Sequence, residues 1–191
     1  MQISRKKLLL HTCCAPCFSH VYEVLKDSYN VTSYFYNPNI SPRDEYEKRL
    51  SELKRYAEEI GFQLIVGSYD IREWTQRVKP FRFMGERSER CWNCYHFRLE
   101  KTFIHAVDEG YDIVATSLSI SPHKDAYRIN KSGNELEKKY GIPFLTADFK
   151  KKDGFKKSVE LSKKHGFYRQ NYCGCIYSKM ERETASVYYT K

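Results

Sequence analysis

Short apolar segments alternate along this chain with longer amphipathic segments, and this alternation constrains the fold more than any other feature. Five strands are predicted, at residues 6–11, 31–36, 62–66, 111–117 and 142–146. Helices are predicted at residues 15–28, 42–60, 89–109 and 125–140, with a last helix after Cys175. Alternating strands and helices need crossover connections, which give a parallel sheet covered on both faces. The expected fold is therefore α/β, a doubly wound, mostly parallel five-stranded sheet with helices on both faces.

The second predicted helix has the clearest ends in the sequence. Ser41 is predicted to cap it, Pro42 fits its first position, and Asp44 can close a capping box with Ser41. Gly61 follows its last apolar residue and is predicted to end it. Residues 72–90 are basic and are expected to be irregular.

The composition indicates one folded domain over residues 1–191, since 41% of residues are hydrophobic and 30% are charged. The longest early apolar run, Leu8 to Leu10, is too short for a membrane span or a signal peptide, so a cytoplasmic protein is expected. The formal net charge of +9 favours a polyanionic partner, most often nucleic acid.

Seven cysteines fall in three clusters, and each cluster lies near the predicted start of a helix. They are Cys13, Cys14 and Cys17; Cys91 and Cys94; and Cys173 and Cys175. An odd number of cysteines in a reducing compartment argues against a disulfide framework. A helix amino terminus favours the thiolate form, which is the form that binds metals. The clusters therefore predict a composite metal site.

The spacing of the cysteines suggests two metal centres. Cys91 and Cys94 lie three residues apart and should share the inward face of their helix. Cys13 and Cys14 should project in opposite directions in an extended backbone. Seven thiolates divide as four, which suit an iron–sulfur cluster, plus three, which leave a single metal an open position. Two alternatives stay open, a zinc-stabilised, non-catalytic RNA-binding module and a small redox protein acting on protein thiols. No phosphate-binding glycine loop follows the first strand, so ATP or NAD binding there is not expected.

Five motifs together resemble one family. They are His11-Thr12-Cys13-Cys14-Ala15-Pro16-Cys17, Tyr36-Asn37-Pro38-Asn39-Ile40, Cys91-x-x-Cys94-Tyr95 with Arg98-Leu99, Ser119-Ile120-Ser121-Pro122-His123-Lys124, and Tyr168-Arg169-Gln170-Asn171-Tyr172-Cys173-Gly174-Cys175. In this order they resemble the QueH family, the cobalamin-independent epoxyqueuosine reductases. The resemblance covers nearly the whole chain, and the fold expected with it is adenine nucleotide alpha hydrolase-like.

The resemblance implies a tRNA-modifying oxidoreductase that reduces the epoxide of epoxyqueuosine, at the wobble position of the anticodon, to the alkene of queuosine. It implies a [4Fe-4S] cluster beside a mononuclear iron, with tRNA and an external electron donor as partners, and we expect a monomer. We expect the cluster to be held by Cys14, Cys91, Cys94 and Cys173, and the single iron by Cys13, Cys17 and Cys175. Some relatives carry an aspartate in place of Cys17, which suits a ligand of the lone iron.

Candidates for the remaining roles follow from their positions. The leaving oxygen needs a proton donor, and His123, Lys124 and Asp125 follow the fourth predicted strand. Asn37, Asn39 and Tyr95 are expected to contact the modified base or to support the metal site. RNA phosphates are expected to bind Lys79, Arg82, Arg87, Arg90, Lys150, Lys151, Lys152, Lys156 and Lys157, although interleaved acidic residues also fit a solvated charged surface.

Overall fold

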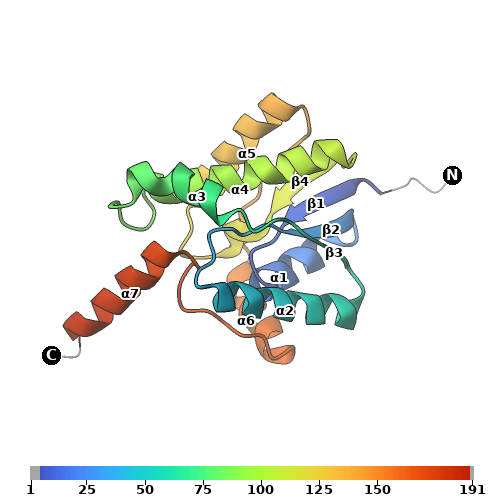
Figure 1. Ribbon diagram of the computed structural model, residues 1–191. Helices are drawn as coiled ribbons and strands as arrows, with labels where there is room; N and C mark the ends of the chain where they lie inside the picture. The colour runs from blue at the N-terminus through green and yellow to red at the C-terminus, as the bar shows by residue number, and fades with distance from the viewer. Residues whose placement is uncertain (1–4, 190–191) are drawn as a thin grey trace.

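A four-stranded parallel sheet forms the centre of the fold (Figure 1). The structure is a computed structural model and describes residues 5–189, with side chains from residue 5 to residue 184. The strands are β1 (Lys7–His11), β2 (Asn30–Phe35), β3 (Gln63–Val66) and β4 (Ile113–Thr116), in the order β3-β2-β1-β4. Leu8, Leu9 and Leu10 of β1 are fully buried, because helices cover this central strand on both faces.

The helices form two layers, one on each face of the sheet (Figure 1). One layer contains α1 (Ala15–Leu25), α2 (Arg43–Ile60) and α6 (Gly154–Lys164). The other contains α3 (Ile71–Val78), α4 (Glu89–Asp108) and α5 (Ala126–Tyr140). Two short 3₁₀ helices, η1 (Lys79–Phe81) and η2 (Ser117–Ile120), follow α3 and β4. The predicted α/β class, with a parallel sheet between two helical layers, is confirmed.

The last helix, α7 (Ile176–Tyr189), extends away from the rest of the molecule (Figure 1). Its first turns are held by the side chains of Glu86 and Arg90, which bond to Ser178 and Glu181. These contacts fix the start of α7 beside α4, and with it the segment that carries Cys173 and Cys175.

The predicted fifth strand was wrong among the described residues. Residues 142–146 contribute one isolated parallel bridge, between Phe144 and Val114, and no strand. Pro143 has no backbone N–H to donate, so pairing beside β4 cannot extend toward the start of this segment. The segment instead packs through Phe144, which is buried against α5.

Two helices lie where no helix was predicted from the sequence. Residues 72–90 were expected to be irregular, yet α3 covers most of the first half and buries Trp74 and Val78 four residues apart. The lysine-rich segment before the last cysteines contains α6. The buried face of α6 carries Ser158 and Ser162, whose hydroxyls donate to backbone carbonyls, so hydrophobic periodicity did not reveal it.

The predicted cap of the second helix was also wrong. The residue preceding α2 is Pro42, and its side chain makes no capping bond. Ser41 instead contacts the segment before α7, where its backbone N–H donates to the carbonyl oxygen of Gly174 (2.8 Å). Gly61 ends the helix as predicted, with a left-handed φ of 77°.

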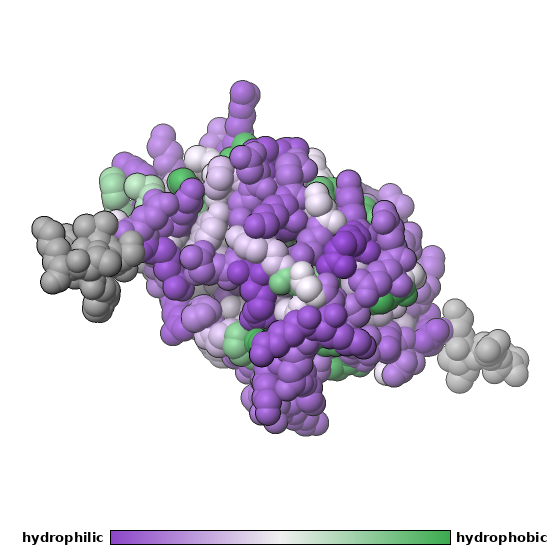
Figure 2. Space-filling view, turned by 90° about the horizontal axis from the view of Figure 1, so that it is seen from below, coloured by the Kyte–Doolittle hydropathy of each residue, from purple (hydrophilic) through white to green (hydrophobic). Residues whose placement is uncertain are grey.

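The surface is mainly polar on the face seen in Figure 2, where hydrophobic residues form only small, separate patches. Within residues 5–189, no helix is both long enough and apolar enough to cross a membrane.

Candidate metal centre

All seven cysteines come together at the carboxyl ends of the strands. Cys13 and Cys14 follow β1, and Cys17 lies in the first turn of α1; Cys91 and Cys94 lie in the first turns of α4; Cys173 and Cys175 immediately precede α7. The seven belong to one core or pack against it. Cys17, Cys91, Cys94, Cys173 and Cys175 also line a cavity of about 310 Å³. The predicted convergence of three distant thiol clusters is confirmed.

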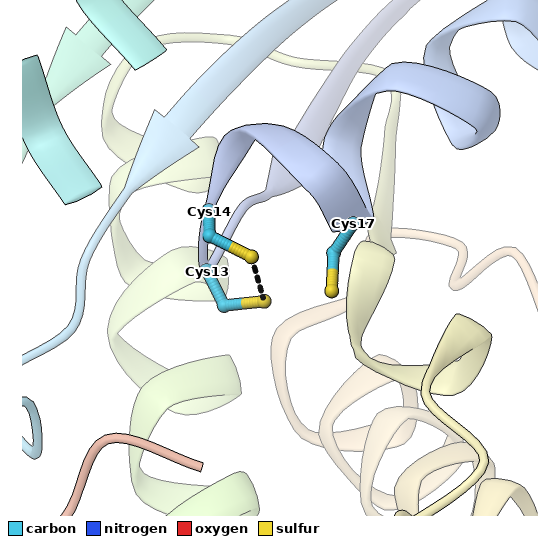
Figure 3. Close-up of side chains that lie close together, drawn as sticks. All are labelled: Cys13, Cys14 and Cys17. Carbon is cyan, nitrogen blue, oxygen red and sulfur yellow. Dashed lines mark hydrogen bonds between the residues drawn. The ribbon is translucent and has the colours of Figure 1, made fainter. Parts of the chain in front are cut away.

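The first cluster is compact. The sulfurs of Cys13, Cys14 and Cys17 all lie within 4.8 Å of one another, and those of Cys13 and Cys14 are 3.7 Å apart (Figure 3). The expectation that Cys13 and Cys14 project in opposite directions was wrong. The chain bends at Cys13 as it passes from β1 into α1, so the alternation of a straight strand does not apply.

The second and third clusters form the other part of the site. The sulfurs of Cys173 and Cys175 are 3.5 Å apart. The indole Nε1–H of Trp74 donates to the sulfur of Cys94 (3.3 Å), so α3 supports this side of the site. Burial and the neighbouring thiols Cys94 and Cys173 raise the pKa of Cys91 to about 11.

In each part of the site, one cysteine has a lowered pKa. It is Cys13 in the first cluster and Cys173 in the part formed by the second and third clusters. Hydrogen bonds from Cys14 and Cys17 hold the pKa of Cys13 well below its usual value. The hydrogen bond between the thiols of Cys173 and Cys175, together with the charge of Lys124, lowers the pKa of Cys173 to about 5. The same bond raises the pKa of Cys175. These shifts favour the thiolate form of Cys13 and of Cys173.

Two cations face these sulfurs, Arg98, which is buried, and Lys124, which is half-buried. Arg98 is 3% exposed, and within the described chain no carboxylate pairs with it; its Nη1–H donates to the amide oxygen of Asn37 (3.2 Å). Burial acts to lower the pKa of Arg98, but the charges of Cys94 and Cys13 raise it more. The charges of Cys13, Cys17 and Cys173 likewise outweigh burial and raise the pKa of Lys124. Cysteine thiolates in this site would thus favour the charged forms of both cations.

The donor set fits metals that prefer sulfur. Thiolate ligands select iron–sulfur clusters, zinc and Cu(I), whereas Mg²⁺ and Ca²⁺ need carboxylate or carbonyl oxygens. The three sulfurs of the first cluster already lie at separations that one ion could bridge. The residues present therefore fit an iron–sulfur cluster and an adjacent metal ion.

His11 supports the site from inside the sheet. Its ring nitrogens lie 3.0 Å from the hydroxyl of Thr116 and 3.1 Å from the carbonyl oxygen of Tyr36. Burial and the charge of Arg98 lower its pKa to about 3, so the ring is neutral. It links β1 to β4 and to the end of β2, as a satisfied core histidine does.

The three candidates for the proton donor differ in position. Lys124 lies among the thiols in the cavity wall. His123 is exposed at the same wall. The carboxylate of Asp125 caps α5, where it accepts from the backbone N–H groups of Tyr127 and Arg128. Only Lys124 faces the sulfurs.

The nine predicted RNA contacts fall into two sets. The exposed set is Lys79, Arg82, Arg87, Lys151, Lys152, Lys156 and Lys157. Arg90 is buried against Glu181 (2.6 Å), and the ammonium of Lys150 donates to the carbonyl oxygens of Ser119 and Lys124. Arg87 also donates to the backbone oxygens of Pro122 and His123. Arg90 and Lys150 therefore stabilise the cavity wall.

Sequence reasoning did not identify several residues that contact the sulfurs or line the cavity. Arg98 and Trp74 contact the site as described above, and Arg169, Gln170 and Arg182 line the cavity. The amide Nε2 of Gln170 donates to the sulfur of Cys14 (3.2 Å). The motifs quoted above contain Arg98, Arg169 and Gln170, but a motif does not tell which of its polar residues face a site.

A solved structure resembles the fold. It is described as a predicted subunit of tRNA methyltransferase from Methanocaldococcus jannaschii, with a TM-score of 0.56 and 18% sequence identity, and the match covers 80% of this chain and 76% of that one. At this identity, the likeness shows the fold alone.

Curated relatives match the sequence over nearly its whole length. The epoxyqueuosine reductase QueH of Thermotoga maritima is 39% identical over 178 residues, covering 92% of this chain and 91% of the relative. Those of Haemophilus influenzae and Streptococcus pyogenes are 40% and 37% identical, and the match covers 71% of each. The family model described as epoxyqueuosine reductase QueH matches residues 8–181. With its seven converging cysteines, the chain belongs to the epoxyqueuosine reductase QueH family.

Proposed function

We propose that this chain reduces the epoxide of epoxyqueuosine, at the wobble position of a tRNA anticodon, to the alkene of queuosine. The reaction consumes two electrons and two protons and releases water. The observation that carries the proposal is the convergence of all seven cysteines in one core, with five of them lining one cavity, in a chain of this family. A site for stability alone would not need a cavity beside its thiols.

The proposed cofactors are a [4Fe-4S] cluster and an adjacent mononuclear iron. When bound, they would supply one-electron transfer from an external donor and Lewis-acid polarisation of the epoxide oxygen. The chain contributes the seven thiols, and Arg98 and Lys124 offset the negative charge of thiolates in a buried site.

Two allocations of the thiols are to be distinguished. The sequence-based allocation gives Cys14, Cys91, Cys94 and Cys173 to the cluster and Cys13, Cys17 and Cys175 to the iron. The proximity of Cys13, Cys14 and Cys17 favours exchanging Cys14 with Cys175. Mössbauer spectra of Cys14→Ser and Cys175→Ser decide between them. The variant in which the signal of the mononuclear iron is weaker identifies the ligand of the single iron.

Lys124 is the proposed proton donor to the leaving oxygen. It faces three of the thiols, whereas His123 is exposed and Asp125 is committed to capping α5. Thiolates near Lys124 favour its protonated form. Lys124→Met should lower kcat by about 100-fold or more. His123→Ala is the matched control, and an equal loss in both variants would remove Lys124 from this role.

The exposed basic residues near the cavity are proposed to hold the anticodon arm. Arg82 and Lys79 precede α4, and Lys151 and Lys152 precede α6, whose first turn places Phe155 in the cavity wall. These segments flank the opening through which a nucleotide would reach the thiols.

The proposal is tested anaerobically with the iron-loaded protein and tRNA that carries epoxyqueuosine. Nucleoside mass spectrometry should show conversion to queuosine when a chemical reductant is added. Analysis should give iron and inorganic sulfide, and the protein should be brown. A colourless protein that holds only zinc and binds tRNA without converting it would instead support a zinc-stabilised RNA-binding module.

The variant Cys91→Ala tests whether the thiols are needed both for the cluster and for the reaction. Cys91 lies in the cavity wall and belongs to the proposed cluster in either allocation. The variant should lose the visible absorbance of the cluster and the conversion of epoxyqueuosine together. A variant that keeps both would contradict the assignment.

A further inference from the structure

The side chain of Asn39 is buried and has no partner. It is 2% exposed, its amide oxygen is one of the buried polar atoms without a hydrogen bond, and its amide nitrogen donates none among the described residues. Buried polar side chains in native proteins are nearly always hydrogen-bonded. Asn39 lies in the wall of the cavity that five of the thiols also line.

Gln170 adds a second free acceptor to the same cavity. Its amide nitrogen donates to the sulfur of Cys14, while its amide oxygen is buried and unpartnered. The loop of Asn39 is held beside the last cysteines, because the backbone N–H of Ser41 donates to the carbonyl oxygen of Gly174. Two residues of the cavity wall that share it with the cysteines thus each carry an unpaired amide oxygen.

Asn37, two residues before Asn39, differs from Asn39 in that its amide is fully hydrogen-bonded within the protein. Its amide nitrogen donates to the carbonyl oxygen of Thr12 (2.8 Å), and its amide oxygen accepts from Arg98 (3.2 Å). Both groups of Asn37 are satisfied inside the protein, and both groups of Asn39 are left unpaired. The same residue type therefore has two different roles in one loop.

We propose that Asn39 is a substrate-binding residue that, with the amide oxygen of Gln170, accepts hydrogen bonds from the two ring hydroxyls of the modified base. This inference rests on the proposed function. The five-membered ring that bears the epoxide also bears two adjacent hydroxyls, whose O–H groups are donors. An aminomethyl link separates that ring from the deazaguanine. Because the epoxide has to reach the thiols, the acceptors close to the thiols meet the ring and not the base edge.

The proposal makes opposite predictions for stability and for binding. An unpaired buried amide destabilises the folded state, so Asn39→Leu should be at least as stable as the parent chain. Asn37→Leu should unfold at lower denaturant concentration, because it leaves Arg98 and the Thr12 carbonyl without their partners. A loss of stability in Asn39→Leu equal to that in Asn37→Leu would assign Asn39 a structural role.

Binding is measured with the iron-loaded protein, without air and without reductant, on three forms of one tRNA. They carry epoxyqueuosine, queuosine, or 7-aminomethyl-7-deazaguanine, which keeps the base edge and lacks the ring. Asn39→Leu should raise Kd about 10-fold for the first two forms, the effect of one lost hydrogen bond to a ligand, and leave Kd for the third unchanged. Iron content should stay at the level of the parent protein.

Each other outcome overturns the inference. An equal rise in Kd for all three forms would mean that Asn39 reads the base edge or the backbone, and no rise would mean that it contacts no part of the substrate. Loss of iron would make it a support of the metal site. Failure of the proposed function is separate, since the parent protein would then not convert epoxyqueuosine when reductant is added, whatever Asn39→Leu does to binding.

Discussion

At the scale of single residues, charge in the interior decides much of the behaviour of this site. Arg98 places a permanent positive charge in a region where seven thiols meet and where, within the described residues, no carboxylate offsets that charge. Thiolates repel one another, and metal binding requires them to be deprotonated together. Arg98 is therefore expected to make metal binding more favourable.

Arg98→Met should weaken iron binding by about 10-fold, as expected for a residue that supports the ligands without binding the metal. The measurement is the iron content per chain after dialysis against a chelator without air. Arg77→Met, which removes the same charge from the exposed face of α3, should retain iron like the parent protein. Equal retention in both variants would remove Arg98 from this role.

Gly133 is required for packing although it lies inside a helix. The α5 helix continues through it, and a side chain there would overlap the ring of Phe144. Gly133→Ala should destabilise the protein by about 1–3 kcal/mol, because overpacking outweighs the gain in helix propensity. Lys131→Ala, exposed on the same helix, should change stability by about 0.5 kcal/mol or less. Urea denaturation of both variants checks this.

At the scale of elements, sequence patterns identified those that bury an apolar stripe and missed those that do not. The strands β1 to β4 and the helices α1, α2, α4, α5 and α7 were expected from apolar periodicity. The α6 helix buries serines, so it carried no apolar stripe. The α3 helix has a stripe of Ile71, Trp74 and Val78, but it spans only eight residues and was missed within a basic segment. Residues 142–146 are apolar enough for a strand, but Pro143 limits their pairing to one bridge.

The position of α7 depends on few contacts. The Arg90 side chain is 4% exposed and pairs with Glu181 (2.6 Å), which is 38% exposed. Glu181→Gln should cost about 1 kcal/mol, because a buried guanidinium loses its counter-charge while the other partner is partly solvated. Hydrogen exchange of amides in residues 176–184 should become faster. Glu109→Gln, an exposed change after α4, should leave this exchange unaltered.

At the scale of the whole molecule, the net charge of +9 is expected to set the overall affinity for RNA, while the cavity sets specificity. The double variant Lys151→Gln, Lys152→Gln should weaken binding of modified and unmodified tRNA equally. The slope of log affinity against log salt should fall by about 2, one for each phosphate contact. The same change at Lys54 and Lys138, exposed on α2 and α5, should leave the slope unchanged. Filter binding over a salt series measures both.

The location of the site was predictable, but its interior was not. Parallel strands end at one edge of the sheet, so cysteines after β1 and at helix starts had to meet there. The directions of the sulfurs of Cys13 and Cys14 depend on a bend that the sequence does not reveal. The burial of Arg98, the position of Lys124 beside the thiols and the unpaired amide of Asn39 follow from packing between segments far apart in the chain.

The thiols that meet in this site come from residues 13 to 175, so nearly the whole chain must be made before the site can close. During synthesis, the first five cysteines leave the ribosome without the two that follow α6. A cofactor that uses all seven thiols can therefore be completed only after Cys175 has been made. A cell that makes the chain faster than it can deliver iron would accumulate folded protein with free, reactive thiols.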